Sequence, residues 1–178
     1  MREKNKLIEK RGKAILPLSF IMLIVFSMSV SAYSLDWGWV YNDPLTVSVY
    51  INSNVPNLSD VVSGYDNWDS LPEVDTYRSY NFNYTEAYII YSSVSNDSYA
   101  DTTKLGSSDW KQITIRPPFS TLTSTKRKET IAHEMGHCWG LNDIYDSSLL
   151  SGTIMRGTGF NNNPYPKQDD KNGIAALY

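Results

Sequence analysis

The stretch HEMGHCWGLND, residues 133–143, decides which fold and which chemistry the rest of the chain must support. Four residues make slightly more than one helical turn, so on a helix His133 and His137 lie one above the other on a single face. Two imidazoles in that arrangement can bind one zinc ion, and Glu134 points beside them, where a general base could reach a zinc-activated water. The spacing therefore predicts a zinc-binding helix.

A catalytic zinc site needs a third protein ligand, and the composition restricts the choice. His133 and His137 are the only histidines, and no glutamate follows Glu134. The candidates, with a tyrosine or water as fallbacks, are Asp143, Asp146, Asp169 and Asp170. We favour Asp143, because Gly140 can take a left-handed conformation that turns the chain back towards the metal. An ordinary surface or capping role for Asp143 is the alternative.

The zinc-binding helix is expected to begin at an N-cap within residues 123–125 and to end near Leu141, with Gly140 as its exit residue. At 100° per residue, the histidines separate from an apolar face that includes Met135 and Cys138. Cys138 is the only cysteine, so no internal disulfide can form. We expect its thiol to pack in the core rather than to act in redox chemistry.

Patterns before this helix predict a sheet and one further helix. Alternating apolar residues predict a strand over 45–51, and apolar residues at helical spacing predict a helix capped by Asn57 and ended by Pro72. Residues 93–109 read as a loop. The further strands are expected within residues 79–84, 86–93 and 111–116. After the zinc-binding helix, residues 153–168 show little periodicity, and Asp169 or Asp170 is expected to cap a short terminal helix.

The first 32 residues have the pattern of a signal peptide. A basic segment over 1–13 precedes an apolar run over 14–30, and small residues before Ala32 suit signal peptidase. We expect cleavage after Ala32, secretion, and one domain over 33–178; an uncleaved anchor with the domain outside the membrane is the alternative.

Cleavage would leave 10 basic and 17 acidic residues, a net charge of −7. This balance argues against nucleic acid or an anionic membrane as a partner, since both attract clustered positive charge. The short basic run over 126–128 is expected to be a solvated helix face. We expect a monomer.

Three motifs of the chain resemble those of a known family of metallopeptidases. Residues 133–143 resemble the extended motif of the metzincin metallopeptidases, HExxHxxGxxH, in the Asp-ended form similar to that of snapalysin-type bacterial proteases. In SGTIMRG, residues 151–157, Met155 resembles the Met-turn methionine beneath the metal. The ending DDKNGIAALY, residues 169–178, is similar to the matrixin pattern DDxxGIxxLY. These motifs cover about residues 130–178, and upstream only the order of elements is similar.

The resemblance implies a metzincin-like α+β fold: a twisted mixed sheet with two helices, one of them the zinc-binding active-site helix, and an irregular C-terminal subdomain ending in a short helix. It implies His133, His137 and Asp143 as zinc ligands, Glu134 as the general base and Met155 as a hydrophobic floor. By the same analogy, residues 160–166 would shape the pocket for the side chain after the scissile bond.

The chain also departs from the family pattern. The third ligand position is not histidine, residues 33–44 leave no room for a propeptide with a cysteine switch, and no histidine remains for the structural zinc of vertebrate matrixins. A latency mechanism and secondary metals are therefore not implied, and nothing in the sequence supports calcium.

The predicted function is that of a secreted zinc-dependent endopeptidase, matrixin-like, that hydrolyses peptide bonds in proteins. Two alternatives stay open: a catalytically silent secreted binding protein that keeps zinc as a structural staple, and a zinc hydrolase acting on a non-peptide bond. The intact Glu134 favours an enzyme, because a purely structural site needs no base.

Overall fold

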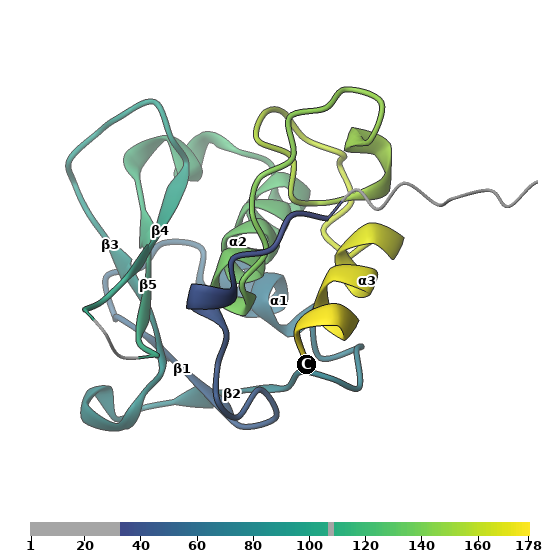
Figure 1. Ribbon diagram of the computed structural model, residues 1–178. Helices are drawn as coiled ribbons and strands as arrows, with labels where there is room; N and C mark the ends of the chain where they lie inside the picture. Colours follow the sequence, from purple (N-terminus) through teal and green to yellow (C-terminus); the bar gives the residue numbers. More distant parts are fainter. Residues whose placement is uncertain (1–32, 107–108) are drawn as a thin grey trace, which may run out of the picture.

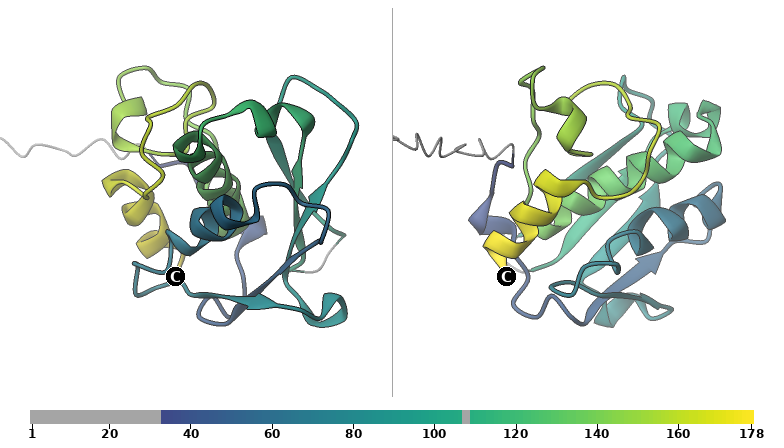
Figure 2. Two further views of the ribbon diagram at one scale, coloured as in Figure 1. Left: turned by 180° about the vertical axis from the view of Figure 1, so that it is seen from behind. Right: turned by 90° about the vertical axis from the view of Figure 1, so that its right-hand side faces the viewer.

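The computed structural model describes residues 33–106 and 109–178. Its strands are β1 (Val47–Ile51), β2 (Thr76–Ser79), β3 (Ala87–Tyr91), β4 (Ala100–Lys104) and β5 (Lys111–Ile115), and its helices are α1 (Leu58–Asp66), α2 (Ser124–Trp139) and α3 (Gln168–Leu177). The strands form one sheet, α1 and α2 pack together on one side of it, and α3 lies beyond α2, away from the sheet (Figures 1 and 2).

The order of the strands across the sheet is β2-β1-β3-β5-β4. All neighbours are parallel except β4, which runs antiparallel to β5 and forms one edge. The expected α+β class with a mixed sheet is confirmed. The expected signal peptide lies outside the described residues, and within the described ranges no helix is long and apolar enough to span a membrane.

Two expectations about strands were wrong. Within residues 93–109, expected to be a loop, the chain forms β4. Its sequence ADTTK lacks apolar alternation, and its extended backbone comes from pairing with β5. Within residues 79–84 only Ser79 belongs to a strand, and Phe82–Tyr84 form a 3-10 turn instead. The ring of Phe82 packs on Tyr50 and Tyr88 of the sheet surface, so it contributes to packing without extended backbone.

The helix α1 has Asn57 as its N-cap, as predicted, but its capping interaction and its C-terminal end differ from the prediction. Asn57 takes a left-handed conformation, with φ 54°, and its side chain makes no capping hydrogen bond. The helix ends at Asp66, before a series of turns, rather than close to Pro72. Gly64 explains its close approach to α2, since a Cβ there would lie 2.6 Å from the Cβ of Ile131.

Polar and apolar contacts fix α2 against α1 and the core. Cys138 is fully buried, and burial raises the pKa of its thiol to about 12, in keeping with a packing role. The basic run over 126–128 is only partly solvated, because Arg127 Nε donates to the buried carboxylate of Asp60 at 2.7 Å. Trp68 Nε1 donates to the Ala132 carbonyl oxygen at 2.9 Å. The helix that carries the histidines is therefore rigidly placed.

Candidate metal centre

The helix α2 brings the two histidine rings together, as their spacing predicts. Thr123 accepts a hydrogen bond from Lys126 N at its start, and Gly140 ends it in a left-handed conformation with φ 98°. The Nε2 atoms of His133 and His137 lie 3.1 Å apart. Their rings meet edge to face, at an interplanar angle of 89°. Both imidazoles thus present the same nitrogen to one point.

Backbone carbonyl groups determine which ring nitrogens carry the protons. His133 Nδ1 lies 3.0 Å from the Ile154 carbonyl oxygen, and His137 Nδ1 lies 2.7 Å from the Leu141 carbonyl oxygen. A carbonyl oxygen can only accept, so each Nδ1 must be the protonated nitrogen. In the neutral rings each Nε2 atom consequently carries a lone pair that is available to a metal ion. Such outer hydrogen bonds are typical of histidines that bind a metal.

Asp143 completes the cluster from the loop after Gly140. Its Oδ1 lies 3.2 Å from His133 Nε2 and 3.6 Å from His137 Nε2. A tetrahedral zinc ion with bonds of roughly 2.0–2.1 Å requires its ligand atoms to be about 3.3–3.4 Å apart, which is close to all three separations. Asp143 Oδ1 is buried and, with both rings neutral, has no donor among the described residues. These three residues could therefore bind a metal ion.

The other aspartates are not brought to this point. Within the described residues, His133, His137 and Asp143 are the only group of three or more such side chains close enough to share an ion. Asp146 is exposed and accepts hydrogen bonds from Ser148. The remaining candidates, Asp169 and Asp170, belong to α3.

Asp170 has a structural role that its sequence position did not reveal. It lies at the third position of α3, whose N-cap is Lys167, so the expectation of an Asp169 or Asp170 cap was wrong. Its buried carboxylate accepts from Lys167 N at 2.7 Å, from Ile154 N at 2.9 Å and from the Thr153 hydroxyl. It therefore joins the terminal helix to the segment whose Ile154 carbonyl orients His133.

Met155 is 2% exposed and packs against α2, and its expected role as a floor beneath a metal stays a prediction. Its Sδ occupies the space over Gly136, where a Cβ would collide with it. Gly136 lies between the two histidines, so the glycine of HEMGH is what admits the methionine. Gly136 was not predicted to have a role, although its position inside a helix, where glycine is unfavourable, was a signal.

Tyr145 is a further contact that sequence reasoning missed. Its hydroxyl donates to Asp143 Oδ2 at 3.1 Å, which leaves Oδ1 for the metal position. The charge of Asp143 raises the pKa of Tyr145, so the phenol stays protonated and able to donate. Its ring covers Gly157, and Ile144 N bonds to the Met155 carbonyl oxygen at 2.6 Å. The ligand loop is thereby held against the Met155 segment.

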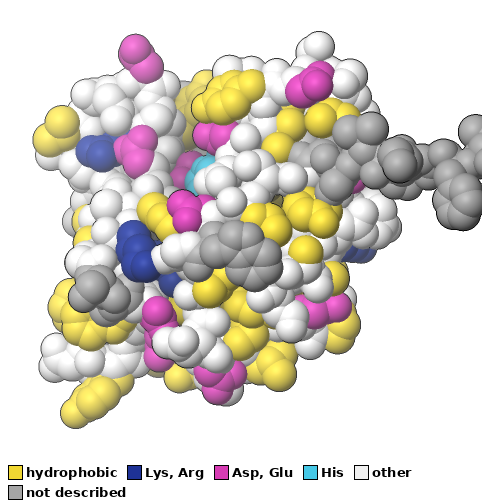
Figure 3. Space-filling view, viewed as in Figure 1, with side chains coloured by type: hydrophobic (Ala, Val, Ile, Leu, Met, Phe, Trp, Pro, Cys, Tyr) yellow, Lys and Arg dark blue, Asp and Glu magenta, His cyan; other side chains and the backbone are white. Residues whose placement is uncertain are grey.

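Glu134 lies next to His133 on α2, but its carboxylate is directed at Thr102 of β4. Its side chain is 7% exposed, and Thr102 Oγ1 of β4 donates to its Oε2 at 2.6 Å. Together with His133 it borders a cavity of about 680 Å³. In the space-filling view a histidine reaches the surface between acidic side chains (Figure 3). Glu134 is thus placed at an open site beside the metal position, as a general base requires.

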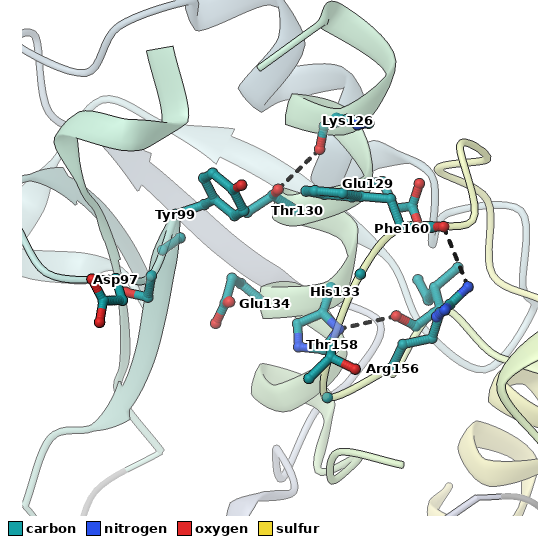
Figure 4. Close-up of a pocket in the computed structure, with 15 residues that line it drawn as sticks. Asp97, Tyr99, Lys126, Glu129, Thr130, His133, Glu134, Arg156, Thr158 and Phe160 are labelled. Carbon is teal, nitrogen blue, oxygen red and sulfur yellow. Dashed lines mark hydrogen bonds between the residues drawn. The ribbon is translucent and has the colours of Figure 1, made fainter. Parts of the chain in front are cut away.

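The cavity is lined by three segments: residues 97–100, which lead into β4, one face of α2, and Ile154 with residues 156–160. Tyr99 and Phe160 form its aromatic wall, with ring centroids 5.5 Å apart (Figure 4). Phe160 therefore lines the cavity, and its expected part in a substrate pocket stays a prediction. Pro164 and Tyr165, however, line a separate depression beside α1, so the expected range 160–166 does not act as one wall.

Electrostatic interactions predict which histidine carries a proton when no metal is bound. Burial alone lowers the pKa of His133, but its interactions with Asp143 and Glu134 raise that pKa to about 9. Burial, together with the charge on His133, lowers the pKa of His137. Below about pH 9 the cation between the ligands is therefore a proton on His133.

Metal affinity is accordingly expected to fall by about tenfold for each unit that the pH drops below about 9, because one proton must leave His133 Nε2 for each ion bound. Zinc titration against a competing chelating dye, repeated at several pH values, measures this slope. Asp143→Asn serves as the control, since loss of the carboxylate lowers the pKa of His133 and flattens the dependence. An affinity independent of pH in the native protein would contradict this assignment of the proton.

Comparison with solved structures identifies proteins with a similar fold. Two structures of myroilysin, a metallopeptidase, are similar to this chain at 13% sequence identity and a TM-score of 0.58. One match covers 81% of this chain and 97% of that chain, and the other covers 79% and 86%. No family model and no curated protein matches the sequence. The chain therefore has a metalloprotease-like fold, and at this identity the likeness extends to the fold alone.

Proposed function

We propose that residues 33–178 are the catalytic domain of a secreted zinc-dependent endopeptidase. The observation that carries the proposal is the convergence of three potential ligand atoms, from His133, His137 and Asp143, beside the carboxylate of Glu134. Two histidines and one carboxylate are an accepted ligand set for catalytic zinc. Borderline-soft zinc suits these imidazole nitrogens better than calcium or magnesium, which prefer oxygen ligands. The metalloprotease-like fold supports the same assignment.

The chain's own residues divide the work of peptide hydrolysis. Zinc, when bound, supplies a Lewis acid that polarises a carbonyl oxygen and makes water more acidic. Glu134 takes a proton from the attacking water and donates it to the leaving amine. Asp143 and the two histidines hold the metal position, and Tyr145 orients Asp143. The Ile154 and Leu141 carbonyl groups keep each imidazole in the tautomer that leaves Nε2 free.

The surroundings of the site suit an extended polypeptide substrate. The edge strand β4 runs along α2, so its unpaired side can form main-chain hydrogen bonds with a peptide. The cavity between Tyr99, Phe160 and His133 can take a side chain of that peptide. A zinc hydrolase for a small non-peptide substrate would have no use for the strand edge.

Purified residues 33–178 are expected to hydrolyse casein, to lose that activity with a zinc chelator, and to regain it when zinc is added back. The loss is expected to be nearly complete, because the ligands converge on one ion on which the reaction depends. Release of soluble peptides measures the rate, and bound zinc is measured in the same samples. A folded, zinc-loaded protein without turnover on casein or a peptide library would instead favour a secreted binding protein with a structural zinc.

A further inference from the structure

Thr102 joins the edge strand to the general base. Its hydroxyl lies 2.6 Å from Glu134 Oε2 and 3.1 Å from the Glu134 carbonyl oxygen. The shorter contact is the charge-assisted one, and such hydrogen bonds are roughly twice as strong as neutral ones. No described residue donates to Glu134 Oε1, so this oxygen remains available for proton transfer. One carboxylate oxygen is therefore held while the other is free.

The register of β4 shows where the main chain of Thr102 points. Arg116 N bonds to the Tyr99 carbonyl oxygen, and Leu105 N bonds to the Trp110 carbonyl oxygen. In an antiparallel pair the bonded residues alternate, so residues 99, 101, 103 and 105 of this strand direct their N–H and C=O groups towards β5. Residues 100, 102 and 104 direct theirs to the open edge, where no described strand pairs with them.

We propose that Thr102 is a positioning residue that couples peptide binding to the orientation of Glu134. Its main chain faces the edge where an extended substrate would add as a strand, and its side chain holds the base. A peptide bound to that edge would meet the main chain of Thr102, and the side chain of this same residue holds Glu134 Oε2. This inference rests on the proposed peptidase function, and it assigns Thr102 no contact with the reacting atoms.

The test compares Thr102→Val, which keeps the shape of the side chain but removes the hydroxyl, with Thr102→Ser, which keeps the hydroxyl. Thr102→Val is expected to lower kcat by about 10- to 100-fold, the effect of losing a hydrogen bond to a charged group. KM and zinc content should change by less than about twofold, because neither ligands nor main-chain edge are altered. Thr102→Ser should restore kcat to nearly the native value.

Thr103→Val is the matched control. Thr103 is the next residue of the same strand, is exposed, and has its side chain on the opposite face of the sheet. It should keep native kcat. The proposal is overturned if Thr102→Val keeps native kcat, if Thr103→Val shares the loss, or if Thr102→Ser fails to reverse it.

Crystal structures of the zinc-loaded Thr102 variants separate this inference from the proposed function. Glu134 should leave its native rotamer in Thr102→Val and keep it in Thr102→Ser, whether or not the native protein hydrolyses peptides. An unmoved Glu134 in Thr102→Val overturns the positioning role. Absence of turnover in the native protein, by contrast, counts against the peptidase assignment.

Discussion

Glu134→Gln is expected to lower kcat for peptide hydrolysis by about 10²- to 10⁴-fold, the usual contribution of a general base, while zinc content stays native. The amide has the size of the carboxylate and can still accept the hydrogen bond of Thr102, so its position should hold. It cannot, however, take a proton from water at neutral pH. Rates on a fluorogenic peptide, measured together with bound zinc, report both quantities on one sample.

Glu129→Gln is a suitable control for Glu134→Gln. Glu129 is a buried glutamate of the same helix, one turn earlier, whose carboxylate accepts from the backbone N–H groups of Asn161 and Asn163. An amide there can weaken the loop but cannot remove a base from the metal position. If Glu134→Gln retained near-native turnover with full zinc, Glu134 would not be the base and the proposed mechanism would be wrong.

The histidine part of the site could be predicted because it depends on local geometry. His133, Glu134 and His137 belong to one helix, whose periodicity alone separates the ligand face from the core face. Asp143 was favoured for a similarly local reason, the left-handed turn at Gly140, and the structure places its Oδ1 beside both rings. Four candidate aspartates could be reduced to one only by the fold, since Asp170 is buried against Thr153 and Ile154 instead.

Contacts between distant segments could not be predicted in this way. Thr102 reaches Glu134 across 32 residues, from a strand whose polar sequence indicated a loop. Its strand character comes from pairing with β5, and its importance comes from lying at an edge. Tyr145 reads as an ordinary loop residue until the chain turns its hydroxyl onto Asp143. Patterns within a segment thus predict faces, whereas partners follow from the order of strands.

Asp143→Ala is expected to weaken zinc binding by more than about 100-fold, which is the upper end of the loss caused by removing only an outer hydrogen-bond partner of a ligand. Among the described residues, the change removes the only anionic atom within 4 Å of both Nε2 nitrogens. It should also abolish hydrolysis at zinc concentrations that saturate the native protein. Competition with a chelating dye measures the affinity, and thermal unfolding without metal checks that the domain still folds.

Asp146→Ala is the matched control for Asp143→Ala, because Asp146 lies three residues later, is exposed, and its carboxylate accepts hydrogen bonds from Ser148. Native zinc affinity in Asp143→Ala would remove Asp143 from the site.

Asp143→His tests whether the length of the ligand side chain matters. The backbone holds a short carboxylate 3.2 Å from His133 Nε2, so a longer imidazole would overshoot that position. We therefore expect Asp143→His to bind zinc more weakly than the native protein, and full affinity would show that the loop can adjust. Charge adds a second reason, because an anionic ligand attracts the cation more strongly than a neutral one.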